Sequence, residues 1–185
     1  MTAPLVEEDD ASTPLTDKER EDLIPSYITL RSELNEAEQR NILEAENWAF
    51  TRQRDVLSEQ FLKDLHKRMY GRVWRWAGKF RQSERNIGVD AYRISSDIRQ
   101  LLDNCHYWIE HNTYEPDEIA ARFHHQLVFI HPFPNGNGRH ARTATNLMLI
   151  ALGRDPFSWG SVNLVNASET REAYVAALRA ADQYC

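Results

Sequence analysis

The chain contains 185 residues, with a formal net charge of −6 and a sequence isoelectric point of about 5.6. This acidic balance argues against binding to nucleic acids or to anionic membranes, and no stretch is apolar enough for a transmembrane span. The two cysteines lie far apart without a disulfide or zinc pattern, and the N-terminus does not resemble a signal peptide, so we expect a cytoplasmic protein.

Apolar residues at helical spacing predict an all-α fold of ordinary domain size. Residues 1–15 are acidic and poor in apolar anchors, so we expect them to be disordered. We expect N-terminal helices within residues 16–55, including a short one that ends near Pro25, and a helical core domain over residues 56–185. The predicted longer helices cover residues 35–52, 58–70, 95–111, 116–130, 138–152 and 169–182.

Local patterns predict finer features of three of these segments. Asn35 is the predicted N-cap of the first long helix, with Glu38 three residues later in the position that completes a capping box. Between residues 78 and 94, short alternating runs interrupted at Gly88 favour a small β-hairpin or an extended flap. His124 and His125 lie on the helix predicted over residues 116–130, where packing or hydrogen bonding is their expected role.

The run from His131 to Arg142 is the most informative stretch for function. Gly136 and Gly138 allow unusual backbone conformations and close ligand approach, and a helix is predicted directly after them. The N–H groups and the dipole of a helix N-terminus favour an anion. Arg139 and Arg142 share one face of the first turn, where positive charge is unfavourable unless an anion binds between them. His131 lies just before the loop, where a general base would reach a hydroxyl next to a bound phosphate.

This run matches every fixed position of His-Pro-Phe-x-x-Gly-Asn-Gly-Arg-x-x-Arg, the signature of the Fic family. The sequence therefore resembles that family, and from residue 33 to residue 174 it is similar to the subgroup called mobile mystery protein B. The resemblance implies a Fic-type helical bundle with a small β-hairpin flap beside the active site. It also implies a protein adenylyltransferase that uses ATP and Mg²⁺ to transfer AMP to a hydroxyl side chain of a target protein.

The resemblance assigns roles to individual residues of the motif. His131 would deprotonate the target hydroxyl, which attacks the α-phosphate of ATP, and Phe133 would point into the core and fix the loop. Asn137 would touch phosphate oxygens, and Arg142 would hold the γ-phosphate. The positions implied to bind the nucleotide are Gly136, Asn137, Gly138, Arg139 and Arg142, with Tyr174 and Asp182 near the adenine or ribose.

An inhibitory helix in many Fic proteins carries Ser/Thr-x-x-x-Glu-Gly/Asn. Here the corresponding stretch keeps Glu46 and Asn47 but has Ile42 in place of Ser or Thr. The resemblance implies that Glu46 pairs with Arg142 and blocks the γ-phosphate position, which would keep the enzyme autoinhibited. The alternative is that Glu46 lies on a solvated helix face.

The flap would take part in target binding. In Fic proteins a flap beside the active site docks the target segment by strand addition, and the matching residues here are Ile87, Gly88 and Val89. Ile87 and Val89 would flank the target chain. The alternative interpretation is a surface hairpin without function.

Asn135 departs from the family pattern, because many active members carry Asp or Glu there to help hold Mg²⁺. A neutral carbonyl oxygen is a weaker magnesium ligand than a carboxylate, although the ion can still bind through the triphosphate. Two classes of function therefore stay open: an AMP-transferring enzyme, or a nucleotide-binding regulatory module with little turnover. A Fic enzyme that transfers another phosphate-containing group, or removes AMP, is a neighbouring option. The oligomeric state is also open, a homodimer included.

Overall fold

The computed structural model describes residues 20–159 and 167–182 of the chain. Its long elements within these ranges are helices: α2 (Arg31–Phe50), α3 (Glu59–Tyr70), α4 (Ile94–Glu110), α5 (Pro116–Ile130), α6 (Asn137–Ala151) and α7 (Ala167–Ala181), with the 3-10 turn η1 (Ala91–Arg93) before α4. The predicted all-α fold is confirmed, and each predicted longer helix has its counterpart. None of the helices in the described ranges is both long and apolar enough to span a bilayer.

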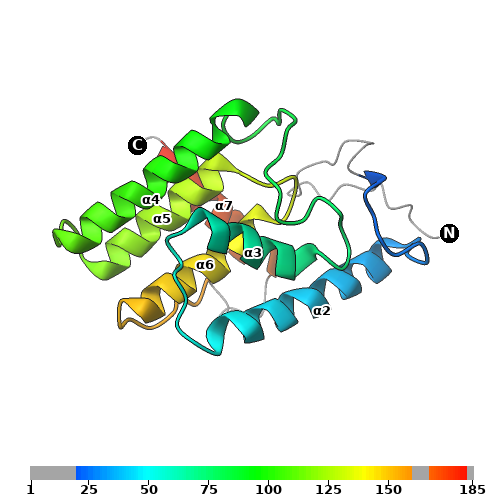
Figure 1. Cartoon of the computed structure of the whole chain (residues 1–185), viewed down its shortest axis with the longest axis horizontal. Helices are drawn as coiled ribbons and strands as arrows, with labels where there is room; N and C mark the ends of the chain where they lie inside the picture. Colours follow the sequence, from blue (N-terminus) through cyan, green and yellow to red (C-terminus); the bar gives the residue numbers. More distant parts are fainter. Residues whose placement is uncertain (1–19, 160–166, 183–185) are drawn as a thin grey trace.

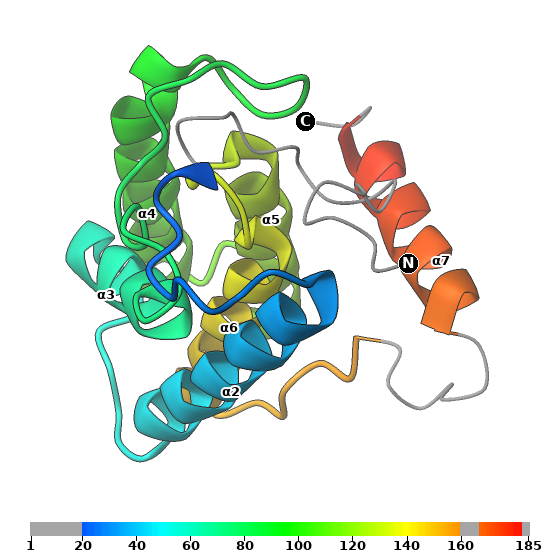
Figure 2. The ribbon, with the colours of Figure 1, turned by 90° about the vertical axis from the view of Figure 1, so that its right-hand side faces the viewer.

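Helix α5 packs against both α4 and α6, and α2 and α3 pack together beside α6 (Figure 1). Helix α7 lies at one side of this bundle, away from α3 and α4 (Figure 2). The core is built from apolar side chains of all the central helices, and its most deeply buried members include Leu62, Leu65, Ile98, Phe123 and Leu149. Burying one such side chain contributes roughly 1.5–3 kcal/mol. The bundle thereby fixes the connection between α5 and α6, residues 131–136, against α3.

Helix α2 begins at Arg31, four residues before the predicted N-cap Asn35. The carboxylate of Glu33 accepts hydrogen bonds from the backbone N–H groups of Thr29 and Leu30, at 2.9 and 3.0 Å. These bonds lower the pKa of Glu33 and satisfy backbone donors ahead of the first turn. The prediction that Asn35 caps the helix is wrong, because the acidic side chain that closes the N-terminus is Glu33.

Residues 71–78, directly after α3, form hydrogen-bonded turns, and residues 79–90 form an irregular flap that leads to η1. Between residues 71 and 90, all of them described, β pairing is limited to the isolated bridge between Trp74 and Leu23, so the predicted β-hairpin is absent there. The guanidinium of Arg81 donates hydrogen bonds to the carbonyls of Ser83, at 3.0 Å, and Val89. A side chain thus satisfies carbonyls that the N–H groups of an opposite strand would satisfy in a hairpin.

The chain just before α2 contacts this same segment. Residues 21 and 22 form a turn that leads into the bridge between Leu23 and Trp74, and the backbone N–H of Arg75 donates to the carbonyl of Asp22 at 2.9 Å. The short helix predicted to end near Pro25 does not reach that residue, because residues 21–25 are a turn, a bridge and irregular chain; its predicted start lies outside the described residues. The expected disorder of residues 1–15 also lies outside them.

Candidate active site

The loop between α5 and α6 starts at His131, which closes α5 in the left-handed conformation, with φ 53° and ψ 59°. The His131 side chain is buried, and its backbone carbonyl accepts a hydrogen bond from Arg81 Nε at 2.7 Å. Two residues further on, Phe133 is fully buried, and its ring stacks on that of His66 with the centroids 3.7 Å apart. Phe133 therefore points into the core and anchors the loop.

Asn137, the first residue of α6, closes the loop with its side chain. Its Oδ1 accepts a hydrogen bond from the backbone N–H of Phe133 at 2.9 Å, and its Nδ2 donates to the Phe133 carbonyl at 2.8 Å. The side chain is buried and both of its polar ends are engaged within the loop, so it serves first to hold the loop closed.

Gly136 is the N-cap of α6 and has a left-handed backbone, with φ 78°. The ring of Tyr70 packs directly against it, since a Cβ atom built on Gly136 would lie 2.4–2.6 Å from three atoms of the Tyr70 side chain. In the described structure no side chain caps the N–H groups of the first turn of α6. Glycine is therefore required at this turn, and the helix N-terminus keeps donors for an anion.

His66 on α3 supports the loop from the side of the core. The backbone N–H of Gly78 donates to His66 Nδ1 at 3.0 Å, so the ring proton lies on Nε2, which donates to the Asn135 carbonyl at 3.0 Å. Burial, together with the neighbouring His140, lowers the pKa of His66 well below its usual value, which keeps the ring neutral. The role of His66 could not be predicted from the sequence, because nothing in its helical context distinguishes it from an ordinary core residue.

Arg139 and Arg142 bring positive charge to the same turn. Neither guanidinium forms an ion pair with any residue that the structure describes, and that of Arg142 lies 5.6 Å from the ring centroid of Tyr174. Burial raises the pKa of Tyr70, whereas both arginines act to lower it, so both charges lie near the Gly136 turn. Two cations beside an uncapped helix N-terminus favour an anionic ligand.

Glu46 on α2 contacts α6 next to this pair. Its Oε1 accepts a hydrogen bond from Thr143 Oγ1 at 3.0 Å, and the predicted ion pair between Glu46 and Arg142 is not formed in the described structure. Thr143 is buried and Glu46 is half-buried, so the carboxylate does not lie on a fully solvated helix face. The Glu46 carboxylate is instead hydrogen-bonded to Thr143, the residue that follows Arg142.

Helix α7 reaches the site through two polar contacts with α5. The hydroxyl of Tyr174 lies 2.8 Å from His124 Nε2, and Asp182 Oδ1 lies 2.8 Å from His125 Nε2, which confirms the hydrogen-bonding role expected for both histidines. The Tyr174 hydroxyl is also 4.0 Å from the position of a Cβ atom built on Gly138. The structure thus brings Tyr174 to the glycine turn, whereas Asp182 contacts α5 at His125.

Electrostatics keep His131 neutral. Burial and the positive charges of Arg81 and Arg85 lower the pKa of His131 to about 4, against a hydrogen bond to the Val128 backbone that raises it. The ring is therefore uncharged at neutral pH and can accept a proton. A bound polyphosphate would bring negative charge, which raises the pKa of His131 and makes it a stronger base.

The flap lies against His131. A Cβ atom built on Gly88, whose φ is 89°, would lie 2.6 Å from the Cβ atom of His131. Ile87 is 49% exposed, whereas Val89 is 8% exposed and packs in the core. This difference corrects the prediction that both side chains flank a target chain, because only Ile87 is open to a partner.

The loop supplies no carboxylate for a magnesium ion. Asn135 occupies the acidic position of the family motif, and its Oδ1 accepts a hydrogen bond from the N–H of Gly136 at 2.6 Å. Over the ranges that the structure describes, no group of three or more His, Cys, Asp or Glu side chains could hold a metal. The residues present therefore do not fit a magnesium ion held by the protein alone.

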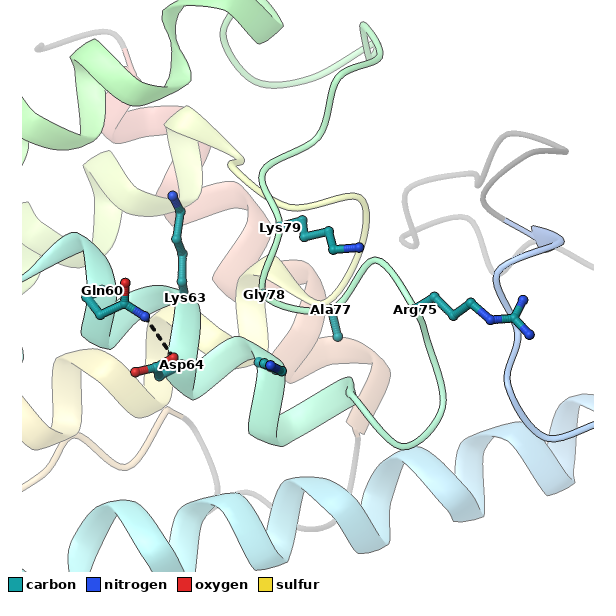
Figure 3. Close-up of a pocket in the computed structure, with 8 residues that line it drawn as sticks. Gln60, Lys63, Asp64, Arg75, Ala77, Gly78 and Lys79 are labelled. Carbon is teal, nitrogen blue, oxygen red and sulfur yellow. Dashed lines mark hydrogen bonds between the residues drawn. The ribbon is translucent and has the colours of Figure 1, made fainter.

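A separate groove of about 390 Å³ lies between α3 and the segment that follows it. Figure 3 shows its lining residues, which are Gln60, Lys63, Asp64, Lys67, Arg75, Ala77, Gly78 and Lys79. The charged ends of Lys63 and Arg75 point away from each other, and Gln60 donates a hydrogen bond to Asp64 at 3.0 Å. Because the charges do not converge on one position, the α5–α6 loop is the stronger candidate site.

The family model described as Fic/DOC matches residues 56–149, just over half of the chain. The chain therefore belongs to the Fic/DOC family. It is 29% identical over 140 residues to protein adenylyltransferase fic-1 of Caenorhabditis elegans, a match that covers 71% of this chain and 25% of that protein. It is 35% identical over 97 residues to protein adenylyltransferase Fic of Drosophila melanogaster, which covers 50% of this chain and 20% of that protein. The chain thus spans about a quarter or less of the length of these curated relatives.

Solved structures share this fold. A Fic family protein from Desulfovibrio desulfuricans has a TM-score of 0.65 at 23% identity, with 92% of this chain and 53% of that chain covered. Fic-1 from Caenorhabditis elegans has a TM-score of 0.63 at 25% identity, with 86% and 46% covered. BepC from Bartonella tribocorum, solved with bound AMPPNP, has a TM-score of 0.59 at 18% identity, with 75% and 80% covered.

Proposed function

We propose that this protein transfers AMP from ATP to a hydroxyl side chain of a target protein. The observation that carries the proposal is the buried, neutral His131, held beside an uncapped helix N-terminus near Arg139 and Arg142. A base next to a polyphosphate site is what nucleotidyl transfer to a hydroxyl requires. The relatives named protein adenylyltransferase support the same activity.

In the proposed reaction the triphosphate binds at the N-terminus of α6 with its α-phosphate near His131. The hydroxyl oxygen of the target attacks the α-phosphorus, and a neutral ring nitrogen of His131 accepts the hydroxyl proton. The bond between the α-phosphorus and the oxygen that bridges to the β-phosphate breaks, and pyrophosphate leaves. The N–H groups of α6 and the charges of Arg139 and Arg142 stabilise the negative charge on the phosphates.

The test follows label from α-labelled ATP into protein, with wild type and His131→Ala side by side. We expect transfer by wild type and a loss of about 100-fold or more in the variant, the usual contribution of a general base. His111→Ala, which changes an exposed histidine at the end of α4, is the matched control and should keep the wild-type rate. If no label depends on His131, transfer is ruled out.

The neutral loop residue gives a second prediction. Asn135→Asp is expected to lower the Mg²⁺ concentration for half-maximal transfer by about tenfold, because a carboxylate replaces an amide next to the triphosphate. A magnesium titration of the transfer rate measures this, with the neutral Asn135→Gln as control. Unchanged metal dependence and activity in Asn135→Asp would show that the amide does not limit magnesium use.

One observation favours a second candidate function. Asn135 carries no charge and its oxygen accepts a hydrogen bond from the N–H of Gly136, so a nucleotide at this loop would find no carboxylate of the loop beside its metal. A nucleotide-binding regulatory module with little turnover fits that arrangement, as does a Fic enzyme that transfers another phosphate-containing group or removes AMP. Calorimetry that detects ATP binding, together with a transfer assay that detects no label, would favour the binding module.

We further propose that Glu46 restrains the enzyme. Its carboxylate, held on Thr143, would compete with the γ-phosphate for the charge of Arg142. Glu46→Gly should therefore raise auto-modification several-fold. Glu44→Gly is the matched control, because Glu44 pairs with Arg72 at 2.6 Å on the exposed side of α2 and its replacement carries the same helix cost of about 1 kcal/mol. Flat transfer in Glu46→Gly would refute autoinhibition.

We also propose where the target segment and the nucleoside bind. Half-exposed Ile87 and adjacent Gly88 support docking of an extended target segment on the flap. Tyr174, near Arg142, and Asp182 support a base or ribose position beside α7. We also propose a core domain over residues 56–185, action in the cytoplasm, and membership of the mobile mystery protein B subgroup, on the sequence similarity described above.

A further inference from the structure

Arg81 is 2% exposed, although its guanidinium carries a permanent charge. Burial of such a group is unfavourable unless its donors are satisfied. Its Nη1 donates to the carbonyl of Ser83 at 3.0 Å, and its Nη2 donates to the carbonyl of Val89. On the other side, Nε donates to the carbonyl of His131 at 2.7 Å, and Nη2 also reaches that of Ile130 at 3.4 Å. One side chain therefore joins the flap to the end of α5.

The backbone adds to this connection. The N–H of Arg81 donates to the carbonyl of Pro132 at 2.9 Å, and the N–H of Val89 donates to that of Ile130 at 3.4 Å. Residue 81 thus bonds to three successive carbonyls, those of residues 130, 131 and 132. These bonds fix the backbone on both sides of the Cα atom from which the His131 imidazole projects.

His131 needs such a constraint. A φ of 53° is uncommon for a residue with a side chain, and it persists only where the surroundings enforce it. The carbonyls at the end of α5 also lack helical partners, and the negative end of the helix dipole lies there. The charged donors of Arg81 satisfy both requirements at once.

Gly88 on the flap packs directly against His131 and Arg81. A Cβ atom built there would lie 2.6 Å from the Cβ atom of His131 and 2.9 Å from Nη2 of Arg81. The flap backbone is therefore in contact with both residues, and a displacement of the flap is transmitted to His131.

We propose that Arg81 is a positioning residue, which locks the flap to the end of α5 and so holds the His131 imidazole in the conformation that proton transfer needs. The inference rests on the proposed function. Arg81 acts through the backbone of His131, because its donors are directed at carbonyls in the protein interior. A target segment that docks on the flap would then tighten the same connection around the base.

The experiment measures AMP transfer by Arg81→Lys and Arg81→Met as kcat and KM for ATP, with ATP affinity from calorimetry. Lysine keeps the charge but lacks the fork that reaches several carbonyls, and methionine keeps the bulk without donors. We expect kcat to fall by about 100-fold in Arg81→Met, as for a base misplaced by about 1 Å, and less in Arg81→Lys. KM for ATP and ATP affinity should stay at the wild-type values.

Arg75→Met is the matched control, since Arg75 is an exposed arginine of the same connection that donates to the carbonyl of Glu21. Wild-type kcat in folded Arg81 variants would overturn the proposal. If the Arg81 variants do not fold, Gly88→Ala tests the proposal, because its added methyl group on the flap pushes against His131. A lower kcat with ATP still bound supports the proposal, and an unchanged kcat overturns it.

A readout without turnover separates the two proposals. If wild type transfers no label, the proposed function fails, and the role of Arg81 is tested on the His131 ring by NMR titration. Arg81 and Arg85 are the cations that act on this ring. In Arg81→Met the pKa of His131 should rise and its resonance should broaden as the ring loses its fixed position. A spectrum and a titration identical to wild type would overturn the positioning role.

Discussion

Replacement of Gly136 by alanine is expected to destabilise the protein by about 2–5 kcal/mol and to abolish nucleotide binding. The left-handed backbone at this position, with φ 78°, costs a residue with a side chain about 1–2 kcal/mol. The added Cβ atom would also meet Tyr70 atoms at 2.4–2.6 Å. Tyr70 is buried, with its ring centroid 4.8 Å from that of His66, so overpacking adds about 1–3 kcal/mol. Relief of the clash must move the first turn of α6, whose N–H groups form the proposed anion site.

Gly153 offers a matched control for that experiment. Its φ is 73°, and a Cβ atom built on it meets nothing within 4 Å. Gly153→Ala therefore carries the backbone cost alone, about 1–2 kcal/mol, and should bind ATP like wild type. Urea unfolding and calorimetry of both variants measure the difference. Equal destabilisation and equal ATP affinity would show that contact with the Tyr70 ring does not shape the turn.

The helices could be predicted because their signals are local. The apolar spacing of α5 and the proline at its first position predict its bounds, Pro116–Ile130, as the structure has them. The start of α2 was predicted four residues late, because its N-cap, Leu30, has no polar side chain, whereas Asn35 with Glu38 fits the usual capping pattern. The β-hairpin predicted for the flap is absent because of a side-chain contact within the fold. The guanidinium of Arg81 donates to carbonyls that the opposite strand of a hairpin would pair with.

The candidate site, like the fold, could be predicted only in part from the sequence. Its motif is contiguous from His131 to Arg142, so this histidine, the glycine turn and the two arginines could be proposed as one site from the sequence motif. The residues that hold it in place lie far away along the chain. His66 is 69 residues from Asn135, and Arg81 is 50 residues from His131. An arginine is usually exposed, so only the three-dimensional arrangement of carbonyls shows why this one is buried.

A fall in pH from 7.5 to 5.5 is expected to remove about 5 kcal/mol of folding stability. Four buried histidines cause this effect: His66, His124, His131 and His140. Burial lowers the pKa of His124, His131 and His140 to about 4 and that of His66 well below its usual value, whereas the unfolded chain titrates near pH 6.5. Between the lowered pKa values of the folded state and the unfolded value near 6.5, the unfolded state binds more protons than the folded state. The free energy of unfolding therefore rises with pH in this range and reaches its full value only above about pH 6.5.

Each of these histidines accounts for slightly more than about 1 kcal/mol of the loss at pH 5.5, and the total reaches the lower end of the stability of a typical domain, about 5–15 kcal/mol. Urea unfolding at several pH values measures the slope. The lowered pKa of Glu33 acts only below pH 4.5, outside this window. His140→Gln should reduce the loss by about a quarter. His111→Asn, at an exposed position, should leave it unchanged. A stability that stays constant from pH 7.5 to 5.5 would mean that these rings take up protons in the folded state, and the imidazole of His131 would then not be the neutral base that transfer to a hydroxyl requires.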